Sequence, residues 1–192
     1  MAKSDPVEAG FTVVIDTAEQ NAWRFVGLKS GADKQYREII VPTVRQSLGR
    51  HPNSNGDYSI LGCEGRVAIE RKAKEDAWGT ILGWATGHEA DHQMPGRRER
   101  FEAELARLNE FESAVVIVEA TLGTLVAQAP SWGVKPVEVN GKIFLRSVIS
   151  YQQRFPRVQW VFADTPRMAE GCAYRWLDRF WRKVGKDGRE RS

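Results

Sequence analysis

The sequence has few cysteines and no long apolar run. Its two cysteines, Cys63 and Cys172, lie far apart and outside any Cys-x-x-Cys spacing. This excludes a disulfide-rich scaffold and favours a reducing compartment. No apolar stretch approaches the length that spans a bilayer, and the first residues contain no hydrophobic segment of an export signal. We therefore expect a cytoplasmic protein that does not contact a membrane.

The overall charge is modest, but basic residues gather locally. Of the 192 residues, 42% are hydrophobic and 28% are charged, which suits one globular domain with a buried core. The net charge of +3 does not by itself argue for nucleic acid. Seven basic and three acidic residues lie between Arg175 and Arg191. Such a stripe suits a phosphate backbone, although a solvated helix face with a disordered tail gives the same pattern.

The stretch from residue 56 to residue 76 is the one around which we expect a site to form. Apolar residues alternate with other residues over 58–60 and again over 67–69, as in half-buried strands. Gly62 and Gly65 mark a turn between these two runs. The pattern predicts a β-hairpin.

Charged residues flank this hairpin. Asp57 opens the first strand, and Glu70 and Lys72 stand two apart near the end of the second, so their side chains point to one face. Two close carboxylates repel unless a positive charge lies between them, and hard oxygen ligands suit Mg²⁺ or Mn²⁺. Lys72 would then orient a water or stabilise developing phosphorane charge. The spacing alone is equally compatible with an exposed hairpin that carries an ordinary Glu–Lys surface pair.

A larger set of residues resembles the nuclease domain of the XPF family of structure-specific endonucleases (XPF/Hef type). That family has an Asp-x-Arg-Glu element, a Gly-Asp, and a Glu-Arg-Lys with three further residues before an Asp. The corresponding residues of this chain are Asp16-Thr17-Ala18-Glu19, Gly56-Asp57, Glu70-Arg71-Lys72 and Asp76. The resemblance runs from about Thr12 to about Val184. We see no helicase and no helix-hairpin-helix module in the sequence. In this respect it resembles the compact stand-alone versions of the family that phages and prophages carry.

One position departs from the family pattern. Ala18 stands where the family has Arg, so the role of that Arg is either lost or supplied by another residue such as Arg24. Asp16, at the end of a short apolar run, is either a site residue or the cap of a turn, and the sequence leaves both open.

The resemblance implies a metal-dependent DNA endonuclease that hydrolyses phosphodiester bonds, with branched or structured DNA among its expected substrates. Asp57 and Glu70 would hold Mg²⁺ or Mn²⁺, with Asp16 close by. Lys72 would position the attacking water or the scissile phosphate. The remaining polar shell would comprise Glu19, Arg71 and Asp76.

Two further surfaces follow from the resemblance. Arg97, Arg98 and Arg100 lie in the first turn of an amphipathic helix expected over 97–109, and we expect them at the DNA backbone, with a solvated helix start as the alternative. The last helix carries an aromatic stripe that Trp181 widens. This stripe is either core or the surface of a homodimer, since XPF-like nucleases pair through related domains.

Two other functions remain as alternatives. A catalytically inactive DNA-binding module of the same fold is one, although such modules usually lose the carboxylates. The other is a zinc metalloprotease, because His88-Glu89-x-x-His92 spells its two-histidine motif. That motif needs a stable helix, whereas glycines precede it and Pro95-Gly96 follows, so we expect a polar loop instead.

The expected fold is a three-layer α/β domain with a central mixed sheet flanked by helices, similar to the restriction-endonuclease-like fold. We expect a disordered segment over residues 1–10, the nuclease domain over 11–184 and a basic tail over 185–192. The expected strands are 11–15, the hairpin, 114–118 and 158–163. The expected helices are 77–82 with Asp76 as cap, 97–109, 122–127, 143–155 and 166–184, with a loop over 132–141.

Overall fold

The computed structural model describes residues 5–30, 36–49, 55–82, 96–130 and 137–189. The strands are β1 (Val7–Glu8), β2 (Val13–Ile15), β3 (Leu28–Lys29), β4 (Glu38–Ile40), β5 (Thr43–Arg45), β6 (Tyr58–Ile60), β7 (Val67–Lys72), β8 (Ser113–Val118) and β9 (Val158–Phe162). The helices are α1 (Lys74–Leu82), α2 (Arg97–Leu108), α3 (Leu122–Ala127), α4 (Val137–Arg154) and α5 (Pro166–Arg189).

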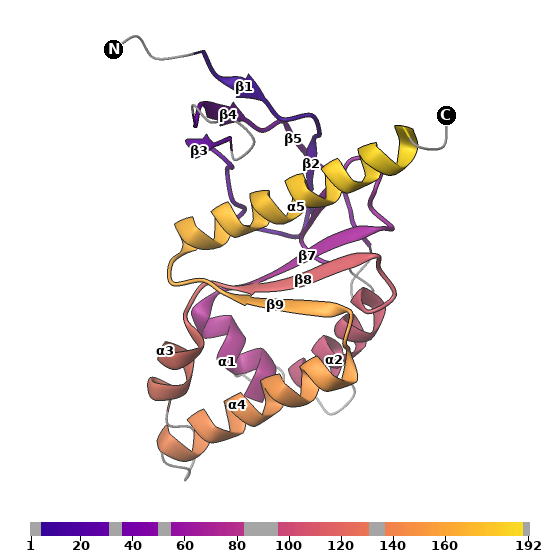
Figure 1. Cartoon of the computed structure of the whole chain (residues 1–192). Helices are drawn as coiled ribbons and strands as arrows, with labels where there is room; N and C mark the ends of the chain where they lie inside the picture. Colours follow the sequence, from indigo (N-terminus) through magenta and orange to yellow (C-terminus); the bar gives the residue numbers. More distant parts are fainter. Residues whose placement is uncertain (1–4, 31–35, 50–54, 83–95, 131–136, 190–192) are drawn as a thin grey trace.

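A six-stranded mixed sheet is the central layer. Its order is β5-β2-β6-β7-β8-β9, with α5 on one face and α1 to α4 on the other (Figure 1). β6 and β7 form the expected antiparallel hairpin, in which Tyr58 pairs with Ile69. β8 pairs in parallel with both β7 and β9. The structure thus confirms a three-layer α/β fold with a mixed sheet.

The two faces of the sheet carry separate cores because side chains alternate along each strand. Val67 and Ile69 of β7 pack with Leu177 of α5. Ala68, one residue out of step, packs with Ile81 of α1 and the rest of the second core. The same alternation places the charged side chains at the end of β7 on different faces. Residues 70 and 72 lie on the α1–α2 side of the sheet, and residue 71 lies on the other side.

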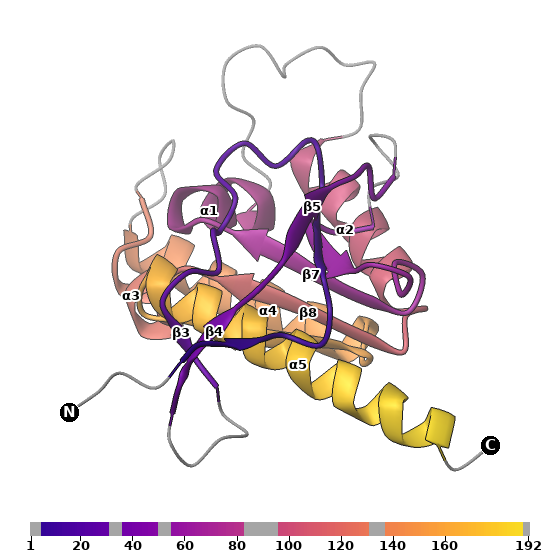
Figure 2. The same ribbon diagram turned by 90° about the horizontal axis from the view of Figure 1, so that it is seen from above.

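A second, three-stranded sheet has the order β1-β4-β3 and lies beside the first half of α5 (Figure 2). Arg167 of α5 donates hydrogen bonds to the carbonyls of Val26 and Gly27, just before β3. β1 pairs in parallel with β4, so residues 7 and 8 form a strand within the segment for which the sequence predicts disorder. The pairing with Ile39 and Ile40 explains the difference. Residues 1–4 lie outside the described part.

Three helix boundaries differ from those expected. α1 begins at Lys74, so Asp76 lies in its first turn and does not cap it. α4 begins at Val137, inside the expected loop, where Asn140 donates to the Pro130 carbonyl and is buried. α5 continues to Arg189, so most of the expected tail is helical. None of the described helices is long and apolar enough to cross a membrane.

Candidate active site

Asp57 is placed at the end of β7 by three hydrogen bonds. Its N–H donates to the carbonyl of Ile69 at 2.8 Å, and its own carbonyl accepts from the N–H of Asp16 at 2.8 Å. Its carboxylate accepts from the N–H of Arg71 at 2.7 Å. Asp57 therefore joins the ends of β2 and β7, as the hairpin predicts for a residue that precedes β6.

Glu70, Lys72 and Asp76 meet on the α1–α2 side of the sheet. The Lys72 ammonium lies 2.5 Å from Glu70 Oε1 and 3.7 Å from Asp76 Oδ2, and it stands 5.0 Å from the ring centre of Phe101 on α2. The Glu70 and Lys72 side chains are only 5% and 11% exposed. A surface pair is therefore excluded, and the Glu–Lys spacing marks a buried charge cluster.

The cluster shifts the acidity of its members. Burial and the neighbouring charge of Glu70 raise the pKa of Asp57 well above its ordinary value, against the opposing effect of Lys72. Burial alone would lower the pKa of Lys72, but Glu70 and the other nearby carboxylates raise it. Lys72 is thus held as a cation at neutral pH. It can attract an anion or orient a water, but it cannot serve as a general base.

Glu104 of α2 is a further member that sequence reasoning did not place in the nuclease site. Its carboxyl is hydrogen-bonded to Glu70, and burial followed by the charge of Glu70 raises its pKa well above the ordinary value. Only its helical position beside the apolar Phe101 and Leu105 hinted that it faces inward. Asp57, Glu70 and Glu104 therefore crowd around the Lys72 ammonium.

Arg71 belongs to a second cluster on the opposite side of β7. Its Nε and Nη2 donate to the two oxygens of Glu119 at 2.8 and 2.9 Å, and its Nη1 donates to Glu19 at 3.3 Å. Trp23 Nε1 also donates to Glu119. Burial alone would lower the pKa of Arg71, but the bonds to Glu119 and the charges of Glu119 and Glu19 together raise it. Arg71 positions the strand end, and Glu119 is the second residue that sequence reasoning missed.

Glu119 had a signal in the sequence. It follows β8 directly, as Asp16 follows β2, and a carboxylate at the carboxyl end of a buried strand is the same cue in both places. The Asp16 carboxylate accepts from the N–H of Ala18 at 3.1 Å and from the Thr17 hydroxyl at 3.3 Å, so it closes a turn. The turn that the capping alternative predicts is therefore present, and the site role of Asp16 stays a prediction.

The described residues contain no group of three or more His, Cys, Asp or Glu side chains arranged to hold a metal ion. The donors that the site does offer are carboxylate oxygens of Asp57 and Glu70. This chemistry fits Mg²⁺ or Mn²⁺, which take one or two protein carboxylates and complete their shells with water and phosphate oxygens.

The three arginines expected at DNA separate around α2. Arg97 Nη1 lies 3.8 Å from Asp76 Oδ1, at the edge of the Lys72 cluster. Arg98 donates to Glu102 at 3.1 Å and lies over the ring of Tyr151, away from the cluster. Arg100 is half-buried in the same first turn. Arg97 is thus beside the candidate site, and Arg98 is directed away from it.

A polar hollow of about 600 Å³ is lined by the segment from Gln20 to Arg24, which follows Ala18, the position that departs from the family pattern. Its lining includes Arg24 and Arg45, and Arg45 Nη1 donates to the carbonyl of Glu19 at 3.0 Å. Arg24, suggested by the sequence as a substitute, is exposed at this hollow.

The protease motif and the homodimer surface stay untested. His88, Glu89 and His92 lie outside the described residues, so the structure does not bear on the protease motif. Trp181 packs on Phe11, with ring centres 6.2 Å apart, and is half-buried within the chain. The homodimer stays a prediction.

No family model and no curated protein matches the sequence. A solved structure of XPF from Aeropyrum pernix, in complex with DNA, matches the fold with a TM-score of 0.52 at 15% sequence identity. The match covers 91% of this chain and 66% of the XPF chain. This chain therefore spans slightly less than two thirds of the length of the XPF chain. The chain therefore has an XPF-nuclease-like fold.

Proposed function

We propose that this protein is a metal-dependent DNA endonuclease of the XPF type. The observation that carries the proposal is the buried meeting of Asp57, Glu70 and Lys72 at the end of β7. Burying like charges around one cation is unfavourable for stability, so such a cluster marks a functional site more often than a structural one. The likeness of the fold to DNA-bound XPF supports DNA as the substrate.

The site suits a hard divalent cation, Mg²⁺ or Mn²⁺. Asp57 and Glu70 would hold the ion, with Asp16 close by, since its N–H donates to the Asp57 carbonyl. When bound, such an ion lowers the pKa of a coordinated water and offsets charge on the scissile phosphate.

The residues of the chain supply the remaining functions. Lys72, fixed between carboxylates, attracts the scissile phosphate and orients the attacking water. Arg71 does not touch this cluster through its side chain, but its N–H holds the Asp57 carboxylate and Glu119 holds its guanidinium. It is therefore a positioning residue. Glu19 supports Arg71, and Asp76 supports Lys72 and Arg97.

Basic side chains on both sides of the cluster would bind the DNA backbone. Arg97 approaches from α2, and Arg24 and Arg45 line the polar hollow on the other side. Phosphate contacts of this kind position the duplex without reading its sequence. Preference for forks, flaps or junctions would then depend on DNA shape.

The test is DNA cleavage by the purified protein with Mg²⁺, Mn²⁺ or EDTA, on supercoiled plasmid and on fork, flap and Holliday-junction substrates. Asp57→Asn, Glu70→Gln and Lys72→Ala should each abolish cleavage and leave DNA binding within a few-fold of the parent. Lys74→Ala is the matched control, because Lys74 is two residues further along but bonds Gln128.

The cleavage and binding results distinguish an active nuclease from the alternatives. Cleavage by Lys72→Ala at the parental rate, or cleavage that persists in EDTA, contradicts the proposal. DNA binding without cleavage in either metal would instead identify an inactive DNA-binding module.

A further inference from the structure

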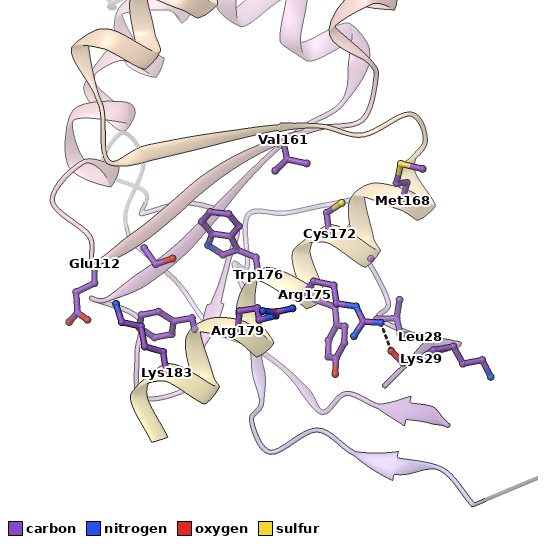
Figure 3. Close-up of a pocket in the computed structure, with 14 residues that line it drawn as sticks. Leu28, Lys29, Glu112, Val161, Met168, Cys172, Arg175, Trp176, Arg179 and Lys183 are labelled. Carbon is purple, nitrogen blue, oxygen red and sulfur yellow. Dashed lines mark hydrogen bonds between the residues drawn. The ribbon is translucent and has the colours of Figure 1, made fainter. Parts of the chain in front are cut away.

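A groove of about 760 Å³ runs along α5, across the sheet from α1 and α2 (Figure 3). Its volume lies within the range of ligand-binding sites. Val161 of β9 forms one side, and Met168, Cys172, Trp176 and Phe180 of α5 contribute apolar surface. Met168 is 53% exposed and Cys172 and Trp176 are half-buried, so apolar side chains from successive turns of α5 line one continuous surface. The groove is therefore an unfilled apolar surface.

The rim of this groove is basic. Lys29, Arg179 and Lys183 are exposed, and Arg175 is half-buried. Glu112 is the one acidic residue among those lining the groove, and its two carboxylate oxygens accept from Arg66 at 2.6 and 2.9 Å. The acid is thus neutralised by a cation from outside the lining, and the groove keeps a positive potential over an apolar floor.

We propose that this groove binds an acidic segment of a partner protein that inserts a bulky apolar side chain. The side chain would fill the space between Val161 and Trp176, where burial of apolar area supplies affinity. Flanking Asp or Glu residues would face Arg175, Arg179 and Lys183, which set the orientation and speed association. This site lies on the other face of the sheet from the Lys72 cluster and does not depend on the nuclease proposal.

The chemistry of the groove disfavours two other occupants. Duplex DNA presents charged phosphates along its outside and keeps its base faces stacked inside, so it offers no bulky apolar group that could enter the groove and fill the floor. A second copy of the chain, docked through the same face, would place four cations against four cations, which repel. An acidic partner with an apolar anchor complements both features at once.

The experiment selects a phage-displayed random dodecapeptide library on the immobilised full chain. Enriched sequences are synthesised with a fluorophore, and their affinity is measured by anisotropy. The expected peptides carry an excess of Asp and Glu around a bulky apolar residue. Enrichment of peptides without acidic residues, or no enrichment, overturns the proposal.

Two pairs of variants locate the binding. Gly171→Leu fills the groove, and a Cβ at Gly171 meets no atom within 4 Å, so the helix accommodates it. Gly171→Ala is its control.

The second pair tests the rim charge. Arg179→Glu with Lys183→Glu reverses that charge. Its control is Lys142→Glu with Arg146→Glu, two exposed α4 positions with the same spacing on the other face of the sheet. Gly171→Leu and the rim reversal should each weaken binding by about tenfold or more, and the controls should not.

Further measurements show whether DNA or a second copy of the chain occupies the groove in place of an acidic peptide. Equal peptide affinity for the parent, Gly171→Leu and the rim reversal places the peptide elsewhere and overturns the proposal. Single-stranded or duplex oligonucleotides whose binding is lost in Gly171→Leu would assign the groove to DNA. A dimer in sedimentation velocity that Gly171→Leu dissociates would assign it to a second copy. If Gly171→Leu does not fold, the rim reversal against its α4 control decides alone.

Discussion

A Cβ atom on Gly56 would lie 2.8 Å from the carbonyl oxygen of Ile69, closer than real side-chain carbons approach such an atom. Gly56 also has a φ of +91°, in the region that L side chains rarely adopt. This close passage lets the next N–H, that of Asp57, donate to the same carbonyl at 2.8 Å. The glycine of the Gly-Asp motif therefore brings the Asp57 carboxylate to the end of β7.

Gly56→Ala should lower the free energy of unfolding by about 2 kcal/mol or more, because strain and a backbone clash add. Urea denaturation measures the loss. Gly65→Ala is the control in the same hairpin, since a Cβ there meets nothing within 4 Å, and it should change stability by about 0.5 kcal/mol or less. Equal losses in the two variants would contradict the role assigned to Gly56.

The elements that the sequence predicts well are those whose pattern is local. β8 is an apolar run buried between two parallel neighbours, and the β6–β7 hairpin shows period-two alternation with glycines between the strands. α3 and the start of α2 also appear where expected. In each case, the residues that define the element are contiguous, so a single window contains the signal.

The elements that the sequence does not predict depend on distant partners. β1 and β3 have two residues each and exist because both pair with β4. The start of α4 contains Val, Asn and Gly, which are weak helix formers, yet its Gly141 allows close approach to the Val126 carbonyl of α3. Tertiary contacts override local propensity at these positions.

The residues of the candidate site also fall into two groups, those that a local pattern places and those that join from distant segments. Alternation along β7 correctly places Glu70 and Lys72 on one face. Glu104 and Glu119 join from segments more than thirty residues away, and no local pattern connects them to the hairpin. Arg71 looked like a member of one shell because it lies between Glu70 and Lys72 in sequence, but alternation turns it to the other face.

Arg71 and Arg66 form a matched pair for measuring the effect of burial. Each donates two hydrogen bonds to a glutamate, and each lies over an aromatic ring, Trp23 or Phe180. The Arg71 and Glu119 side chains are 14% and 6% exposed, whereas those of Arg66 and its partner are 42% and 54% exposed.

Arg71→Met should therefore lower the free energy of unfolding by about 3 kcal/mol, since it leaves a buried carboxylate without its cation. Arg66→Met should cost about 1 kcal/mol or less. Urea denaturation of both variants under the same conditions gives the comparison. Similar costs would show that burial of the pair does not determine its contribution.

The raised pKa of Asp57 predicts a pH dependence of stability in EDTA. Its pKa is higher in the folded than in the unfolded state, because burial and the charge of Glu70 disfavour ionisation. The stability tied to this proton is complete below the unfolded value, near pH 4, and is lost as the pH rises through the folded pKa. Asp57→Asn removes that loss.

The measurement is urea denaturation of the parent and of Asp57→Asn at a series of pH values from about 4 to neutral. The difference between the two curves cancels the other titrating groups, to the extent that they do not interact with Asp57. The variant should gain stability relative to the parent as the pH rises. Curves that stay parallel over this range would mean that the carboxyl of Asp57 has an ordinary pKa.

The structure gives Arg97 and Arg98 different surroundings, although they are adjacent in sequence. Arg97 lies at the edge of the Lys72 cluster, beside Asp76, and its side chain is 28% exposed. Arg98 is directed to Glu102, which also accepts from Arg154, and to the ring of Tyr151. If DNA crosses the cluster, its backbone passes Arg97 and misses Arg98.

Arg97→Ala should therefore weaken DNA binding and reduce the slope of log K against log salt by about 0.9, the value for one lost phosphate contact on duplex DNA. Arg98→Ala should leave the slope unchanged, because its guanidinium serves Glu102 within the protein. Fluorescence anisotropy with a labelled duplex across a salt series, in Ca²⁺ or EDTA to prevent cleavage, measures both slopes. Equal slopes for the parent and Arg97→Ala would show that the first turn of α2 is a solvated helix start, and the path of the DNA would then follow the Arg24 and Arg45 side of the cluster.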